Sequence, residues 1–134
     1  MNRQQKKMYL HGYQSAKVRL RNLQDEYETV FTEATKIVPT LSGMPSSNVK
    51  DDKLLKYTIK LAEIQEKIDR TKKQIERVDL ELAKLKPYHR RLITQIDIKR
   101  VPAQVVAKRQ GITEHAIRTR RNRIIDKMFL QELM

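Results

Sequence analysis

Residues 54–85 read LLKYTIKLAEIQEKIDRTKKQIERVDLELAKL, and this stretch decides the fold. Its apolar side chains recur in alternating steps of three and four residues, the heptad spacing of helices that pack along a narrow stripe. The stripe positions are Leu54, Tyr57, Leu61, Ile64, Ile68, Thr71, Ile75, Val78, Leu82 and Leu85, and only Thr71 is polar. The stretch predicts a long helix that begins near Asp51 or Asp52 and ends at Leu85–Lys86, because Pro87 cannot continue it.

A second heptad pattern precedes the first, from about Gln4 to Val38. Its stripe consists of Tyr13, Ala16, Leu20, Leu23, Tyr27, Val30, Ala34 and Ile37. Between the two patterns, PTLSGMPSSN (39–48) carries two prolines, a glycine and three serines, a composition typical of a loop. Because such a loop makes pairing within one chain entropically easy, we predict that residues 1–86 form a long antiparallel helical hairpin, a coiled coil, with its loop at 39–51. A parallel homodimer of the second helix and a domain-swapped hairpin are the alternatives.

Further apolar side chains lie off both stripes, toward the predicted tip of the hairpin. They are Phe31, Val38, Leu55, Ile59 and Ala62. A two-helix hairpin cannot cover a second apolar stripe by itself. One interpretation is a homodimer contact through these residues, and the other is that they pack beneath the loop.

The charge of the chain is strongly asymmetric. The net charge is +13, and residues 86–134 contribute 12 basic and 4 acidic side chains to it, against 17 and 12 in residues 1–85. A basic C-terminal module is typical of a protein that binds nucleic acid. No apolar stretch approaches the roughly 20 residues of a membrane span, so a membrane partner is not expected. The absence of cysteine fits a reducing compartment, and we expect a cytoplasmic protein.

Residues 87–134 predict an all-helical module of short elements. PYHRRLITQIDI indicates a helix of about ten residues with Leu92, Ile93 and Ile96 facing inward. A second helix begins with Pro102 at its first position and turns Val105, Val106 and Ala107 toward the core. Gly111 supplies a turn, and Thr113 is a suitable N-cap for a last helix. That helix is expected to bury Ile117, Ile124, Ile125 and Met128.

The spacing of this module is that of a helix-turn-helix. Ala107 is small where the two helices approach, Gly111 follows four residues later, and Ile112 and Ile117 fill the gap between the helices. Two positions depart from the usual pattern, because Gln110 and Arg120 stand where apolar residues are common. Four arginines within six residues, 118–123, carry few acidic neighbours, which favours DNA binding over a merely solvated helix.

If the last helix enters the major groove, its first half should face the bases. We predict base contacts from Thr113, Glu114, His115, Arg118, Thr119 and Asn122. Phosphate contacts are predicted from Lys108, Arg109, Arg120, Arg121 and Arg123. The basic N-terminus with Tyr9 and Tyr13 either assists nucleic-acid binding or is a frayed, solvated start of the first helix, and we favour the second interpretation. No phosphate-binding loop, nucleophile motif or metal-ligand spacing occurs, so a non-enzymatic protein without cofactor or metal is expected.

Two motifs give the chain a resemblance to a known family. LSGMPSS followed by KDDKLLKYTIKLAEIQEKI, together with the terminal helix-turn-helix pattern, resembles the phage-encoded ArpU/RinA-like transcriptional regulators. The last part is also similar to region four of bacterial sigma factors, because Val105-Val106-Ala107 stands at its Glu-Ile-Ala triplet and Gly111-Ile112-Thr113 matches its Gly-Val-Ser turn. The resemblance implies a phage or prophage DNA-binding protein that activates late genes and contacts host RNA polymerase.

Two further functions remain open at the level of sequence. Phage terminase small subunits, which package DNA, also combine a helix-turn-helix with coiled helices, although they usually place the DNA-binding module first. A protein-interaction module that acts on RNA polymerase or another regulator is the second alternative. The predicted domains are the helical hairpin of residues 1–86 and the helix-turn-helix DNA-binding domain of residues 87–134.

Overall fold

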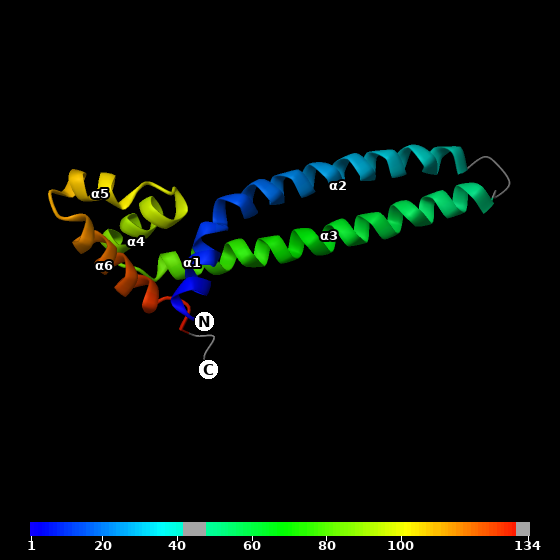
Figure 1. Cartoon of the computed structure of the whole chain (residues 1–134). Helices are drawn as coiled ribbons and strands as arrows, with labels where there is room; N and C mark the ends of the chain where they lie inside the picture. The colour runs from blue at the N-terminus through cyan, green and yellow to red at the C-terminus, as the bar shows by residue number, and fades with distance from the viewer. Residues whose placement is uncertain (42–47, 131–134) are drawn as a thin grey trace. The chain divides into compact units, whose positions relative to one another are not determined.

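The computed structural model describes residues 1–41 and 48–130, except for the side chains of residues 38–41 and 48–51. These residues form six α-helices and one π-helical segment, without a strand, which confirms the predicted all-α class (Figure 1). The elements are α1 (Arg3–His11), α2 (Tyr13–Leu41), α3 (Asn48–Ala83), α4 (Pro87–Ile93), η1 (Thr94–Ile98), α5 (Ala103–Gln110) and α6 (Glu114–Asp126). In this described part of the chain, no helix has the length and hydropathy that a bilayer crossing requires.

The chain divides into two compact units. One consists of residues 17–73, and the other combines residues 1–16 with residues 74–134. The boundary expected from the sequence, between residues 86 and 87, therefore falls inside the second unit. The reason is that α1 packs with α6 and η1, and that the end of α3 accepts hydrogen bonds from Arg90 and from the Phe129 amide.

The unit of residues 17–73 is an antiparallel pair of long helices, α2 and α3 (Figure 1). Leu23 and Val30 of α2 are buried against Ile64 and Ile68 of α3, and Leu20, Tyr27, Tyr57 and Leu61 pack around them. The heptad stripes are therefore confirmed as the contact surface. Thr71, the polar position of the stripe, is also buried, and its hydroxyl donates a 2.8 Å hydrogen bond to the Lys67 carbonyl. This bond removes the cost of burying an unpaired hydroxyl.

The ends of these helices differ from the predicted ones. Helix α2 continues through Pro39 to Leu41 because the φ of proline is compatible with a helix, even though its ring removes one backbone donor. Helix α3 already begins at Asn48, before the predicted start at Asp51 or Asp52. Of the predicted loop, residues 42–47 lie outside the described residues, and so does the side chain of Val38.

The N-terminus forms an ordered helix, so the prediction of a frayed start is wrong. The Asn2 side chain accepts a 2.8 Å hydrogen bond from the Gln5 amide, and the Gln5 side chain accepts one of 2.9 Å from the Asn2 amide. This reciprocal capping box fixes the first turn of α1. Leu10 is fully buried, which anchors the helix to its unit. Gly12 separates α1 from α2, at a point where a Cβ would lie 3.2 Å from the Met8 carbonyl oxygen.

The C-terminal helices bury most of the residues that their spacing predicted. These are Leu92, Ile93, Val106, Ala107, Ile117, Ile124, Ile125 and Met128. Ile96 is half-buried, and Val105 is exposed, so its predicted inward position is wrong. Pro102 caps α5 one position before the helix rather than beginning it. Phe129, which the sequence reasoning missed, is buried as well.

Candidate nucleic-acid interface

A tight turn joins α5 to α6. Gly111 ends α5 with a φ of 69°, a left-handed conformation that glycine adopts without a steric penalty. The Ile112 amide then donates a 3.1 Å hydrogen bond to the Ala107 carbonyl. The Thr113 hydroxyl caps α6 by accepting a 3.2 Å bond from the Ala116 amide. The predicted roles of Gly111 and Thr113 are therefore confirmed, and α6 is fixed where the small Ala107 permits close packing.

Some of the predicted base contacts are exposed side chains, and some are already bonded to other groups of the protein. His115 and Arg118 are exposed. Glu114 accepts two hydrogen bonds from Arg118, at 3.0 and 2.6 Å, so the two predicted contacts form one ion pair along α6. The Thr113 hydroxyl is engaged in the helix cap. Glu114 and Arg118 are the predicted contacts that carry charges at the surface.

Two predicted base contacts lie further back on α6. Thr119 and Asn122 are both half-buried. The amide oxygen of Asn122 is buried and has no hydrogen-bond partner among the described residues. A buried acceptor cannot reach a base edge unless the side chain turns outward, so Asn122 is less accessible than its spacing suggested.

Four of the five predicted phosphate contacts are exposed, namely Lys108, Arg109, Arg120 and Arg123. The fifth, Arg121, is different, because its side chain is only 14% exposed and its guanidinium faces Asp97. Three hydrogen bonds of 2.6–3.1 Å join the two residues. Arg121 therefore packs inside the unit, whereas the other four cations face solvent.

Asp97 is the centre of a buried polar cluster. It lies on η1, where the Lys99 amide donates to the Thr94 carbonyl at 2.8 Å, one residue beyond the usual helical partner. Its side chain is fully buried, and it bonds His11 of α1 at 2.9 Å as well as Arg121 of α6. A single carboxylate thus links α1, η1 and α6. Neither Asp97 nor His11 was predicted to have a special position.

Helix α1 also binds the end of α6. Arg3 makes two hydrogen bonds of 2.9 and 2.7 Å to the Asp126 carboxylate, and Lys6 donates one of 2.9 Å to the Asp126 carbonyl. The hydrogen bond from Arg3 lowers the pKa of Asp126. Burial lowers the pKa of Lys7, and the nearby charge of Arg121 lowers it further. The N-terminal segment thus brings its cations to the same unit as the arginines of α6.

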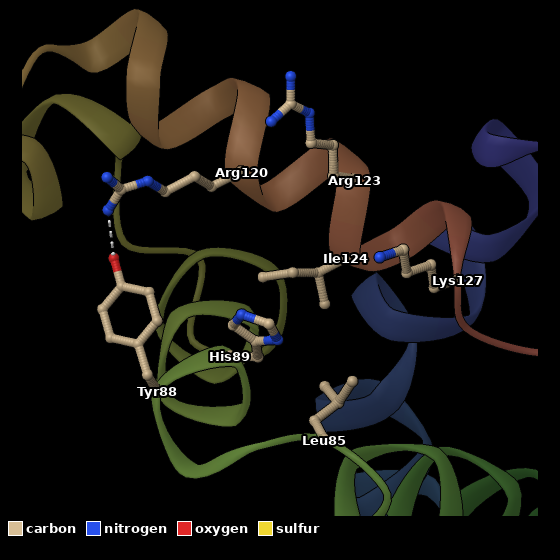
Figure 2. Close-up of a pocket in the computed structure, with 7 residues that line it drawn as sticks. All are labelled: Leu85, Tyr88, His89, Arg120, Arg123, Ile124 and Lys127. Atoms are coloured by element: carbon tan, nitrogen blue, oxygen red, sulfur yellow. Dashed lines mark hydrogen bonds between the residues drawn. The ribbon is translucent and has the colours of Figure 1, made fainter.

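The two departures from the helix-turn-helix pattern meet at one hydroxyl. The Tyr88 hydroxyl of α4 donates a 2.8 Å hydrogen bond to the Gln110 side chain. It also accepts one of 3.0 Å from Arg120, which Figure 2 shows. A polar link between α4, α5 and α6 therefore stands where the usual pattern has apolar contacts. Tyr88 was not singled out from the sequence, because only the fold brings it to these positions.

A small recess of about 190 Å³ opens beside the start of α5. Arg100 at its edge has a φ of 62°, a left-handed conformation that is strained for a residue with a side chain. No side chain caps the N-terminus of α5 here. The lining residues are His11, Ile96, Arg100, Val101, Pro102, Ala103, Arg118 and Arg121. Arg121 and Arg118 are already paired with Asp97 and Glu114, so Arg100 is the lining residue that offers its charge to an anion such as a phosphate group.

No family model matches this chain, and no curated protein or solved structure matches it. The resemblance to the ArpU/RinA-like regulators therefore remains a prediction from the motifs in Leu41–Ile68 and Val105–Met128. Within the described residues, no three or more His, Cys, Asp or Glu side chains are grouped to hold a metal ion.

Proposed function

We propose that this protein is a sequence-specific, non-enzymatic DNA-binding transcription regulator of phage or prophage origin. The observation that carries the proposal is the α5–α6 pair: a left-handed glycine turn positions a capped helix whose solvent face carries exposed cations. This is the geometry through which a helix-turn-helix presents its second helix to the major groove. The late-gene activator role and the contact with host RNA polymerase rest on the family resemblance.

In this proposal α6 lies in the major groove with its N-terminal half nearest the bases. Arg118 would bind guanine through its two terminal donors, for which it must leave Glu114 or share it. Glu114 could then accept from a cytosine amino group. His115 and Thr119 would face neighbouring bases, while Asn122 would contribute only after its side chain turns outward.

The phosphate contacts follow from the exposed cations. Lys108, Arg109 and Arg123 remain the proposed phosphate ligands, and we add Arg100 because it lines the small recess beside α5 that is suited to an anion. We no longer propose Arg121 and Arg120 as phosphate contacts, because Arg121 pairs with Asp97 and Arg120 bonds the Tyr88 hydroxyl. Each phosphate neutralised should contribute about 0.9 to the slope of log K against log salt concentration.

The test compares two arginines in the same local setting. Arg118 and Arg70 each form an exposed ion pair with a glutamate four residues earlier in the helix, Glu114 and Glu66. Binding is measured by fluorescence anisotropy, at several salt concentrations, on a duplex taken from the genomic fragments that the wild type retains. Arg118→Ala should weaken binding by about 10- to 100-fold, because a bidentate base contact is worth about 1–3 kcal/mol. Arg70→Ala should leave binding unchanged.

Equal behaviour of the two variants would contradict the proposal. If neither substitution alters binding, α6 does not read DNA. If both weaken it to the same degree, the interaction is a general attraction to positive charge. A loss of folding is not expected in either case, since both arginines are exposed by more than half.

The α2–α3 unit supports a second candidate, self-association. Phe31, Leu55 and Ile59 are 52%, 58% and 51% exposed, Ala62 is exposed as well, and the rings of Tyr27 and Phe31 stack with centroids 6.4 Å apart. We propose this face as the homodimer contact. Sedimentation equilibrium should then show a dimer at tens of micromolar. A ring-sized species would instead favour the DNA-packaging function, and a monomer would exclude a stable dimer.

A further inference from the structure

A second recess, of about 420 Å³, lies between α4 and the C-terminal half of α6 (Figure 2). It is lined by Leu85, Tyr88, His89, Arg120, Arg123, Ile124 and Lys127. Its volume is in the range of sites that hold a compact ligand or an anchoring side chain. None of the contacts proposed above with DNA requires this recess.

The walls of this recess are mainly apolar. Leu85 and Ile124 face it together with the rings of Tyr88 and His89, which meet edge to face with centroids 6.0 Å apart. Figure 2 shows these four side chains around one space. A phosphate group would gain nothing from such walls, whereas an aliphatic side chain would be removed from water.

The charged side chains at the recess are all basic. The Lys127 amine lies on the side of Ile124 and His89, while the Arg123 guanidinium points away from them (Figure 2). Arg120 bonds only the uncharged Tyr88 hydroxyl among the described residues. Among the described residues, none that lines the recess is acidic. The recess therefore combines apolar walls with positive charge that its own lining does not balance.

Nearby oxygen acceptors are already occupied. Asp126, next to Lys127 in the chain, is bound through its carboxylate by Arg3. At the end of α3 and just after it, the carbonyls of Leu82, Ala83 and Leu85 accept hydrogen bonds from Arg90 at 3.0–3.2 Å. A ligand that supplies both carboxylates and an apolar side chain would complete the recess.

We propose that this recess docks an acidic segment of a partner protein that carries an aliphatic anchor residue. The anchor occupies the space between Leu85, Tyr88 and Ile124, and flanking carboxylates pair with Lys127 and Arg120. Arg123 stays available to DNA, because its guanidinium is directed away from the recess. The site thus allows the protein to hold a protein partner while α6 faces DNA.

The experiment measures peptide binding to the full chain in the absence of DNA. The probe is a fluorescein-labelled peptide of three Asp-Asp-Leu repeats, compared with peptides of Asp-Asp-Ser and Lys-Lys-Leu repeats. The leucine-bearing acidic peptide should bind at least about tenfold more tightly than the serine peptide, because only leucine is stabilised by burial between apolar walls. The Lys-Lys-Leu peptide should not bind.

Two variants separate this recess from the proposed DNA surface. Lys127→Glu should weaken peptide binding at least about fivefold and leave DNA binding nearly unchanged. Lys108→Glu, with the same change of charge on α5, should weaken DNA binding and leave the peptide unaffected. The proposal is overturned if the wild type binds no acidic peptide or binds the serine peptide equally well. It is also overturned if Lys127→Glu weakens DNA and peptide alike, because the recess would then belong to the DNA surface.

Discussion

The α2–α3 pair and the junction of α1 with α6 are both helical, but different forces hold them together. In the pair, Leu23, Val30, Ile64 and Ile68 form a continuous apolar contact. In the junction, a fully buried aspartate binds an arginine and a histidine from two other elements. The α2–α3 contact consists of many similar apolar side chains that repeat along the helices. The junction of α1 with α6 depends on one buried carboxylate, and no neighbouring residue can replace its bonds.

The largest expected effect is a difference in stability between variants of two arginines of α6. Arg121→Ala should destabilise the protein by about 3–5 kcal/mol, because it leaves the buried Asp97 carboxylate without its main counter-charge. Arg118→Ala removes an exposed ion pair and should cost no more than about 0.5 kcal/mol. Urea unfolding followed by circular dichroism measures both. Equal, small costs for the two variants would show that the Asp97 cluster does not stabilise the fold.

The next effect compares two isoleucines of α3. Ile64→Ala should cost about 2–5 kcal/mol, since it opens a cavity in the core of the pair. Ile59 is 51% exposed, and Ile59→Ala should change stability by less than about 0.5 kcal/mol in a monomer. The same urea unfolding experiment is repeated at several protein concentrations. A cost at Ile59 that grows with protein concentration is the result expected from the proposed dimer contact, and a cost that does not depend on concentration would contradict that contact.

A smaller effect is expected at the hydroxyl that links α4, α5 and α6. Tyr88→Phe removes the hydrogen bonds to Gln110 and Arg120 and should cost about 0.5–1.5 kcal/mol. Tyr57→Phe is the control, because no hydrogen bond of its hydroxyl occurs among the described residues. Thermal unfolding of both variants gives the difference. A variant at Tyr88 as stable as the control would mean that the link is incidental to packing.

The smallest effect concerns Arg3 and Asp126. The pKa of Asp126 lies below its ordinary value of 3.8, chiefly because of the hydrogen bond from Arg3. This contribution to stability is present above about pH 3.8 and is lost as the pH falls through the lowered pKa of the folded state. Arg3→Ala should raise the pKa of Asp126, which an NMR titration of its carboxyl group detects. An unchanged pKa would show that α1 is not bound to α6 in solution.

The heptad stripes could be predicted because each position repeats the same physical requirement every three or four residues. All of them, including Thr71, lie in buried or half-buried positions. The turn of Gly111 and the cap of Thr113 were predictable for a similar reason, since each depends on a local backbone conformation. The Asn2 capping box carried the same kind of signal in NRQQ, but the basic composition of the N-terminus obscured it.

The Asp97 cluster could not be predicted in this way. Nothing local distinguishes Asp97 from an exposed acidic residue, because its partners His11 and Arg121 are distant in sequence and meet it only in the fold. Arg121 consequently resembled its exposed neighbours. A DNA-binding test that replaced Arg121 would confuse a loss of folding with a loss of DNA contact, which is why Arg118 is the informative position.

The most direct test of the central claim, that α6 reads DNA, is the sequence preference of the protein. Genomic fragments bound by the wild type and by Arg118→Ala are selected at the same salt concentration and sequenced. We predict that the wild type enriches a shared motif and that the variant loses its preference at one guanine-containing position of that motif. The claim is contradicted if both proteins select the same fragments and these fragments share no motif.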